Sequence, residues 1–208
     1  MATIGVIDYG MGNLHSIAKA LEVAAEGQRV EVSYDPDKLR KADRLVLPGV
    51  GAIRQCMDEL KRLELDQLVR ELAGKKPLLG ICLGMQVLLG RSEENGGTEA
   101  LNVFPGEVKR FPAGAGLKVP HMGWNRLQQA REHRLWAGIP QQSWFYFVHS
   151  YYAAPSDPAH IFATSEYGQR FAAVLIRDNV LAVQFHPEKS QAAGLSLLAN
   201  FVQWNGKA

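Results

Sequence analysis

The first half of the chain alternates short apolar runs with longer segments whose apolar residues recur at helical spacing. Apolar or β-branched runs at residues 3–8, 30–34, 44–49 and 77–81 predict four strands. Helical spacing predicts one helix over 13–25 and a long one from about Ala52 to Leu72. Continuous apolar strands separated by helices are typical of a parallel sheet that is covered on both faces.

The second half carries a different pattern, with short aromatic or β-branched runs divided by turn residues. These runs span residues 102–111, 117–127, 143–153, 160–168, 171–179 and 180–188. Several lie too close together for helical crossovers, so we expect antiparallel hairpins added to the parallel core. A final helix over 190–204 should pack back on the sheet. No repeat, low-complexity tract or linker interrupts the chain, which predicts a single α/β domain over residues 1–208.

Composition and charge narrow the class of protein. Hydrophobic residues make up 47% and charged residues 21% of the 208, an ordinary globular mixture that supports a sizeable core. The net charge of +2, from 23 basic and 21 acidic residues without a basic cluster, argues against a nucleic-acid partner. No apolar run is long enough to span a membrane, and the N-terminal segment is interpreted as a strand rather than a signal peptide. Two cysteines at unrelated positions make no disulfide framework, so we expect a cytoplasmic protein.

Cys82 lies in the stretch "GICLG", between an apolar strand and a helix-forming segment. The first N–H groups of a helix have no backbone partner there, and they favour a negatively charged thiolate. The flanking Gly80 and Gly84 suit a tight turn like the G-x-S-x-G elbow of serine hydrolases. An inert buried cysteine is the ordinary alternative, and it fits Cys56, which lies in mid-helix. For Cys82 the pattern favours a nucleophile with backbone N–H groups beside it to hold an oxyanion.

A base and an orienting carboxylate are present in "FHPEKS", which follows the apolar run "VLAVQ". His186 and Glu188 are two residues apart, so in extended backbone they point to the same side. A carboxylate next to an imidazole fixes its tautomer and supports the imidazolium. A structural histidine–carboxylate pair is the alternative. Together with Cys82, the pair predicts a Cys–His–Glu triad.

The stretch "LPGVGA" at residues 47–52 supplies a third motif. Its small residues permit unusual backbone angles and the close approach of a ligand. Taken alone, the stretch would be interpreted as an ordinary strand-to-helix turn. Beside a nucleophilic cysteine it is a candidate second wall of an oxyanion site.

These three motifs, in this order and spacing, resemble the class I (triad) glutamine amidotransferases over essentially the whole chain. The resemblance implies an α/β fold and hydrolysis of the side-chain amide of glutamine. It assigns Cys82 as nucleophile, His186 as acid and base, and Glu188 as its orienting partner. It further implies an oxyanion hole from backbone N–H groups near Gly51 and of Leu83. The residues it implies for glutamine binding are Gly49, Val50, Gln86, Glu94, His149, Ser150 and Tyr151.

Three further stretches narrow the resemblance to one branch of this family. "IDYGMGNLHS", "PHMGWN" and "YFVHSYY" are similar to members that supply ammonia to a cyclase subunit in histidine biosynthesis. That partner is a (β/α)₈ barrel that makes imidazole glycerol phosphate and aminoimidazole carboxamide ribotide, and the two subunits form a heterodimer. The residues that this resemblance places toward the partner are Gly10, Met11, Gly12, Asn13, Trp124, Tyr146 and Lys189. It implies no cofactor and no metal, and the histidines show no metal-ligand spacing.

Three alternatives to this interpretation stay open at the level of sequence. The first is a cysteine hydrolase that acts on γ-glutamyl conjugates or peptides through the same triad. The second is a non-enzymatic scaffold that only binds a partner. The third is the amidotransferase component of another biosynthetic enzyme.

Overall fold

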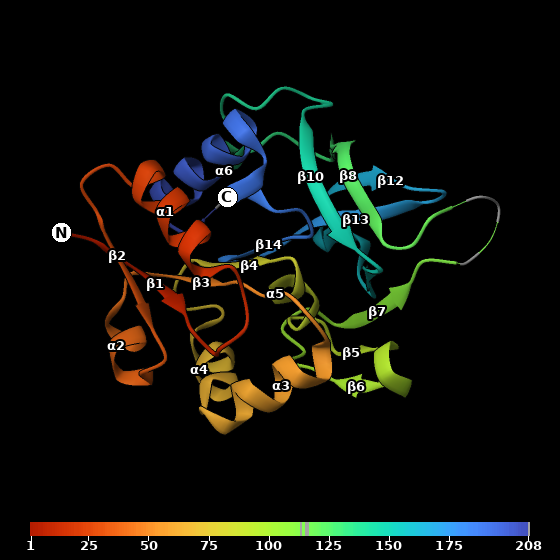
Figure 1. Ribbon diagram of the computed structural model, residues 1–208. Coiled ribbons are helices and arrows are strands. Elements are labelled where there is room, and N and C mark those ends of the chain that lie inside the picture. Colours follow the sequence, from red (N-terminus) through yellow and green to blue (C-terminus); the bar gives the residue numbers. More distant parts are fainter. Residues whose placement is uncertain (113, 115–116, 208) are drawn as a thin grey trace.

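A computed structural model describes residues 1–112, 114 and 117–207, and a large twisted sheet organises them (Figure 1). Within these residues twelve strands form one sheet, whose main path runs β2-β1-β3-β4-β14-β13-β11-β7-β5-β6. Its first five strands run parallel to one another. They are β1 (Thr3–Ile7), β2 (Arg29–Ser33), β3 (Arg44–Leu47), β4 (Leu78–Ile81) and β14 (Val180–Val183). The predicted parallel core is confirmed, and β14 joins it from the far end of the sequence.

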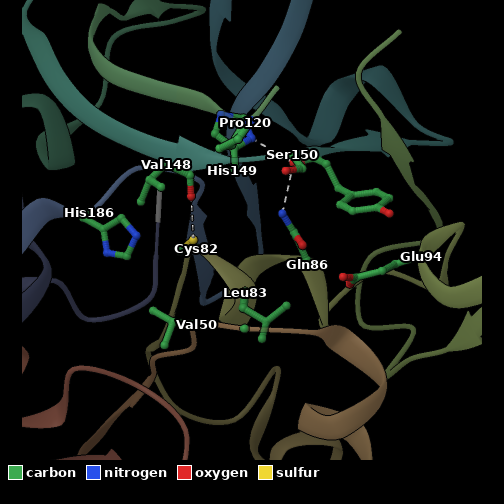
Figure 2. Close-up of a pocket in the computed structure, with 12 residues that line it drawn as sticks. Val50, Cys82, Leu83, Gln86, Glu94, Pro120, Val148, His149, Ser150 and His186 are labelled. Atoms are coloured by element: carbon green, nitrogen blue, oxygen red, sulfur yellow. Dashed lines mark hydrogen bonds between the residues drawn. The ribbon is translucent and has the colours of Figure 1, made fainter. Parts of the chain in front are cut away.

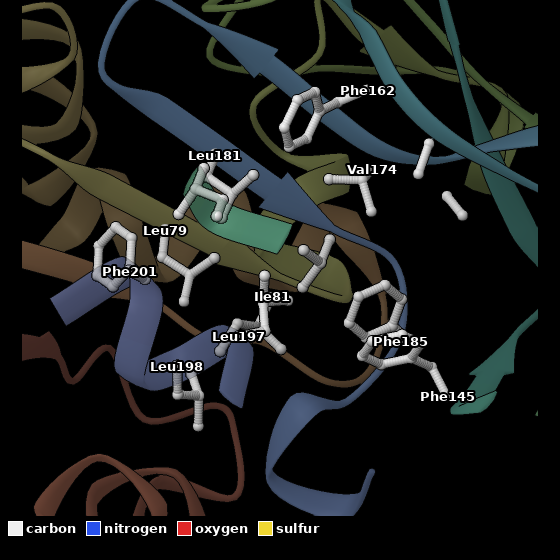
Figure 3. Packing of buried hydrophobic residues seen from close by; sticks show 14 of the residues in the cluster. Leu79, Ile81, Phe145, Phe162, Val174, Leu181, Phe185, Leu197, Leu198 and Phe201 are labelled. Atoms are coloured by element: carbon white, nitrogen blue, oxygen red, sulfur yellow. The ribbon is translucent and has the colours of Figure 1, made fainter. Parts of the chain in front are cut away.

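Helices cover both faces of the parallel strands, because the side chains of each strand alternate between two cores (Figures 1 and 3). Leu79 and Ile81 of β4 pack with α1 (Leu14–Ala24) and α6 (Gln191–Gln203). Leu78 of the same strand packs on the opposite face, with α3 (Ile53–Arg62) and α4 (Leu65–Leu72). The short helix α2 (Pro36–Lys41) lies on that second face as well. The carboxyl ends of β3, β4 and β14 are left at one edge of these layers.

The long helix predicted over 52–72 is two helices in the structure. α3 ends at Arg62, and α4 begins at Leu65 after Glu64 takes a left-handed conformation (φ 58°). A non-glycine residue at positive φ breaks a helix as effectively as a glycine does. The break lets each helix turn its own apolar stripe toward the sheet, with Met57 and Leu60 from α3 and Leu68 from α4.

The predicted antiparallel additions extend the sheet beyond β14. They are β5 (Arg91–Ser92), β6 (Thr98–Glu99), β7 (Gly106–Arg110), β9 (Gln128–Gln129), β11 (Tyr151–Pro155), β12 (Ile161–Glu166) and β13 (Arg170–Arg177). β13 pairs antiparallel with β14, and β11 pairs antiparallel with β13 and β7. The short edge strand β5 is the exception, because it pairs parallel with β7. The 3₁₀ turns are Glu94–Gly96, Arg134–Trp136, Pro158–His160 and Pro187–Lys189.

The run predicted at 143–153 divides at Ser150 and serves two sheets. β10 (Trp144–His149) pairs with β8 (His121–Arg126) in a separate two-stranded sheet, whereas β11 pairs with β7 and β13 in the main one. The strand pair β8–β10 therefore projects from the layers, as Figure 1 shows, while its end at His149 returns to the edge where β4 finishes. None of the described helices is both long and apolar enough to cross a membrane.

Candidate active site

Cys82 sits at a strained elbow between β4 and the short helix α5 (Leu83–Gln86). Its backbone angles are φ 55° and ψ −109°, a combination that non-glycine residues rarely adopt and that costs about 1–3 kcal/mol. The two flanking glycines make the elbow possible. A Cβ on Gly80 would come 2.8 Å from the Gly84 carbonyl oxygen, and one on Gly84 would overlap the Leu47 carbonyl oxygen of β3. The predicted nucleophile elbow is thus present, and it aims the sulfur into a cavity.

His186 and Glu188 form a buried pair beside that cavity. The Nδ1 of His186 lies 2.8 Å from Oε1 of Glu188, and the two side chains are 3% and 1% exposed. The reason differs from the predicted one. The chain forms a 3₁₀ turn over Pro187–Lys189 rather than continuing as a strand, and the turn brings the carboxylate back to the ring.

The imidazole of His186 lies beside the Cys82 sulfur (Figure 2). Burial disfavours the charged ring, but the neighbouring Cys82 and Glu188 outweigh it and raise the pKa of His186 to about 10. Because Nδ1 faces the carboxylate, Nε2 is the nitrogen left for the thiol, and it has no hydrogen-bond partner among the described residues. Cys56 is different, since burial in α3 raises the pKa of its thiol to about 12.

The turn that carries His186 is tied to β10. The backbone N–H of His186 donates to the Tyr146 carbonyl (2.9 Å), and the Tyr146 N–H donates to the Ser190 hydroxyl (3.0 Å). That hydroxyl in turn donates to the His186 carbonyl at 2.6 Å. These bonds set the position of the ring relative to the β8–β10 strand pair.

The loop at residues 48–51 faces the elbow from β3. The Leu83 N–H donates to the Gly49 carbonyl (3.3 Å), so in this conformation it is not free to bind an oxyanion. Beneath the loop, the buried hydroxyl of Tyr9 donates to the Pro48 carbonyl at 2.7 Å. A Cβ on Gly49 would overlap that hydroxyl oxygen, so the close approach requires glycine.

A cavity of about 300 Å³ opens in front of Cys82 (Figure 2). Ten of the residues that line it were predicted for catalysis, the oxyanion hole or glutamine binding: Val50, Gly51, Cys82, Leu83, Gln86, Glu94, His149, Ser150, Tyr151 and His186. Pro120 and Val148 also line it, although none of the sequence motifs points to a role for either. Gly49 and Glu188 stand behind this lining, and they act on it through the Leu83 N–H and the His186 ring.

Gln86 and Glu94 present acceptors to the cavity. The side-chain N–H₂ of Gln86 is fully used, because it donates to the Tyr151 carbonyl (3.0 Å) and to Oε1 of Gln184 (3.1 Å). Glu94 accepts from the Ile53 N–H at 3.0 Å, which places one of its oxygens at the start of α3. Each side chain is therefore held in place before any ligand arrives.

His149 lines the cavity, and both of its ring nitrogens are already engaged in hydrogen bonds. Its Nδ1 lies 2.8 Å from the Tyr151 carbonyl, and its Nε2 lies 2.9 Å from Nδ1 of His121. Burial lowers the pKa of His149 to about 3 and that of His121 to about 4. Both rings are accordingly neutral at physiological pH. The sequence patterns assigned no role to His121, because it meets His149 only through the pairing of β8 with β10.

The residues predicted to face a partner fall into two groups. Trp124 packs edge-on against Tyr146, with ring centroids 5.9 Å apart, and Nζ of Lys189 lies 5.9 Å from the Tyr146 ring centroid. Trp124 remains 43% exposed. Gly10, Met11, Gly12 and Asn13 form the loop before α1. The side chain of Asn13 caps that helix at the Ser16 N–H (3.4 Å), and a Cβ on Gly51 would come 2.9 Å from the methyl carbon of Met11.

Metal ligands do not gather in the part of the chain that the structure describes. No three histidine, cysteine, aspartate or glutamate side chains there lie close enough together to hold an ion.

Comparisons with known proteins identify the family. Residues 5–204 match the family model described as "Glutamine amidotransferase class-I". "Imidazole glycerol phosphate synthase subunit HisH" of Methylococcus capsulatus is 61% identical, over 98% of this chain and 97% of that protein. The HisH subunit of Nitrosococcus oceani is 56% identical and HisH 1 of Pseudomonas aeruginosa 57%, each over at least 99% of both chains.

Solved structures share the fold at low sequence identity. PurLQS from Thermotoga maritima matches with a TM-score of 0.74 and 17% identity, over 96% of this chain and 97% of that one. A putative GMP synthase protein from Thermoplasma acidophilum matches with a TM-score of 0.72 and 21% identity, over 97% and 92%. The sequence relatives carry the finer assignment: the chain belongs to the class I glutamine amidotransferases and, within them, to the HisH subunits of imidazole glycerol phosphate synthase.

Proposed function

We propose that the cavity in front of Cys82 is a glutaminase active site and that its ammonia passes to a cyclase subunit. The chain is a glutamine amidotransferase subunit of imidazole glycerol phosphate synthase, an enzyme of histidine biosynthesis. One observation carries the site assignment. A cysteine at a strained elbow and a buried histidine–glutamate pair, 104 residues apart in the sequence, meet at the same cavity.

The proposed reaction has two steps. The Cys82 thiolate attacks the δ-carbonyl carbon of glutamine, and the His186 imidazolium protonates the departing nitrogen as the carbon–nitrogen bond breaks. Ammonia leaves and a γ-glutamyl thioester remains. Water then attacks the thioester while His186 takes its proton and returns it to the sulfur, which releases glutamate. Glu188 holds Nδ1 of His186 throughout, so Nε2 always faces the sulfur.

Glutamine recognition follows from the acceptors that line the cavity. Because both N–H bonds of Gln86 are engaged, its carbonyl oxygen is the atom it offers to the substrate. Glu94 supplies a carboxylate that suits the substrate's α-ammonium group. Ser150 and Tyr151 form the wall opposite, and His149 supports that wall from behind through the Tyr151 carbonyl.

In this conformation the Gly49 carbonyl occupies the Leu83 N–H, so the oxyanion hole is complete only after the loop changes conformation. The Gly49 carbonyl that accepts from the Leu83 N–H belongs to the Gly49–Val50 peptide. Rotating that peptide withdraws the carbonyl and turns the Val50 N–H toward the same place, where it joins Leu83. The donor would then be the Val50 N–H, one residue earlier than Gly51. We infer a two-state loop whose open state needs the partner.

The partner in this proposal is a (β/α)₈-barrel cyclase in a heterodimer. HisH relatives are named as subunits, which implies a second chain in the synthase. Trp124, Tyr146 and Lys189 lie at the β10 side of the active site, and residues 10–13 lie beside the loop that carries Gly51. Exposed aromatic residues of this kind are enriched at interfaces. Both cysteines are free in the structure, consistent with a reducing cytoplasm, where we place the protein.

Ammonia and glutamate release from glutamine tests the proposal directly. In the presence of the cyclase and its acceptor we expect turnover that falls at least a thousandfold in Cys82→Ala, whereas Cys56→Ala serves as the matched cysteine control and keeps its rate. Turnover that survives Cys82→Ala would refute the nucleophile. Equal rates with and without the cyclase would refute the two-state loop. Hydrolysis of γ-glutamyl conjugates in preference to glutamine would favour the alternative hydrolase.

A further inference from the structure

The hydrogen bonds around Cys82 include one side chain that the triad does not use. Gln184 follows β14 directly, and because β14 is parallel to β4, it stands next to Cys82 at the strand ends. Its Nε2 lies 3.8 Å from the Cys82 sulfur and its Oε1 accepts from Gln86 at 3.1 Å. We propose that Gln184 is a further catalytic residue, whose amide donates a hydrogen bond to the Cys82 sulfur and stabilises the thiolate.

The direction of this hydrogen bond is set by a backbone carbonyl. The Tyr151 carbonyl can only accept, so the Gln86 group that lies 3.0 Å from it must be the N–H₂. The second hydrogen of that N–H₂ then meets the oxygen of Gln184, and the Gln184 N–H₂ is left to face the sulfur. A flipped Gln184 amide would oppose two N–H₂ groups, which is unfavourable in a buried site.

The same carbonyl holds a second chain in place. Nδ1 of His149 must carry its hydrogen to donate to Tyr151, so Nε2 accepts from His121. Nε2 of His121 in turn faces the amide of Asn125 at 3.3 Å. The Tyr151 carbonyl thus accepts from both His149 and Gln86. Gln86 is a positioning residue, because its second N–H sets the orientation of the Gln184 amide.

Burial explains why the Gln184 amide matters to the sulfur. Gln184 is fully buried, and a buried amide needs partners for both of its ends. The Cys82 sulfur also lies 3.9 Å from the Val148 carbonyl, which can only accept from a neutral thiol and repels a thiolate. When the thiol ionises, Gln184 and His186 are the two groups that favour the negative charge.

Other charged groups near the sulfur do not replace this role. The titratable side chains that face Cys82 are His186, from the turn after β14, and Tyr9, from the end of β1. Burial raises the pKa of Tyr9, so its phenol stays neutral, and the hydroxyl is already engaged by Pro48. The inference rests on the proposed function of Cys82 but concerns the sulfur itself, which can be followed without glutamine.

Alkylation of the full chain by iodoacetamide between pH 5 and pH 10 tests the proposal. The rate of labelling at Cys82, read from its peptide by mass spectrometry, rises with the thiolate fraction. In Gln184→Met, which keeps the size and removes the amide, we expect the midpoint to move up by about one pH unit. That shift corresponds to about tenfold less thiolate below the midpoint. An unchanged midpoint in a folded Gln184→Met protein would overturn the proposal.

The variant Gln86→Leu supplies the second arm of the experiment. It releases the Gln184 amide from its fixed direction, so we expect a smaller upward shift, about threefold in thiolate. In the double variant the shift should not exceed that of Gln184→Met alone, because Gln86 acts only through Gln184. Additive shifts, or no shift in Gln86→Leu, would overturn the chain of bonds, and this arm holds even if Gln184→Met fails to fold. Failure of the glutaminase assignment would instead appear as turnover in Cys82→Ala.

Discussion

The Tyr9 hydroxyl supports the loop that faces the nucleophile, and Tyr9→Phe removes that support with no change of shape. The hydroxyl lies 2.7 Å from the Pro48 carbonyl, and the Tyr9 ring is fully buried. Phenylalanine fills the same space, so no large cavity arises. What is lost is one hydrogen bond, and the Pro48 carbonyl is left buried without this donor.

The magnitude follows from that orphaned carbonyl. An unsatisfied buried acceptor costs about 1–3 kcal/mol. For a chain of 208 residues, each kcal/mol corresponds to about 2–4 °C in Tm. We therefore expect Tyr9→Phe to lower the free energy of unfolding by about 1.5 kcal/mol and Tm by about 3–6 °C. Urea and thermal unfolding followed by circular dichroism measure both quantities.

Gly49→Ala tests the same contact from the other side, because the new methyl group would overlap the Tyr9 hydroxyl oxygen. Overpacking of this kind costs about 1–3 kcal/mol. In Tyr9→Phe the oxygen is gone, and the remaining close neighbours of the methyl are Cβ of Leu83 at 2.9 Å and the backbone nitrogen of Gly84 at 3.1 Å. The double variant should accordingly be more stable than the sum of the single losses, by about 1 kcal/mol. Strict additivity, or a Tyr9→Phe protein as stable as the parent, would refute the role given to the hydroxyl.

Three further predictions address the elbow, the histidine pair and the partner face. In Gly84→Ala the new Cβ would overlap the Leu47 carbonyl, so the free energy of unfolding in urea should fall by at least about 3 kcal/mol. Gly27→Ala is the control, because open space surrounds Gly27 and the loss should be about 1 kcal/mol. Equal losses would contradict the close approach of α5 to β3. Since burial lowers the pKa of His149 to about 3 and of His121 to about 4, the unfolded chain takes up protons first as pH falls below 6.5. The free energy of unfolding should then drop by up to about 2 kcal/mol per histidine by pH 5, and His121→Gln should flatten this acid limb. Trp124→Ala should weaken binding of the cyclase by at least tenfold in calorimetric titration, and an unchanged Kd would remove Trp124 from the interface.

Features that depend on short stretches of sequence were predictable. The parallel strands carry uninterrupted apolar runs because both of their faces are buried, so β1, β3 and β4 were evident without a partner strand. The elbow was evident for a similar reason, since the two glycines that make it possible lie within two residues of Cys82. The His186–Glu188 contact was also expected, although a 3₁₀ turn and not an extended strand produces it.

Features that depend on pairing between distant segments were not predictable. Nothing at Glu64 signals a helix break, because the left-handed residue is neither glycine nor asparagine, and the packing of two apolar stripes decides it. The change of sheet at Ser150 depends on which strands pair with the run 143–153: β8 pairs with its first half and β7 with its second half. The contact between His149 and His121 arises only from the pairing of β8 with β10.

Three backbone carbonyls decide what the nucleophile can do, and sequence patterns carry no signal for any of them. The Gly49 carbonyl masks the Leu83 N–H, the Val148 carbonyl favours a neutral thiol, and the Tyr151 carbonyl aligns the amides that favour a thiolate. In the reaction proposed for Cys82, the first two would oppose turnover. Both belong to segments near the residues proposed to face the partner: Val148 to β10, and Gly49 to the loop in which a Cβ on Gly51 would meet Met11. A partner that docks on Trp124 and on residues 10–13 would thus contact the segments that hold the Gly49 and Val148 carbonyls. The Tyr151 carbonyl is bound by both Gln86 and His149, so it keeps the amide of Gln184 directed at the sulfur.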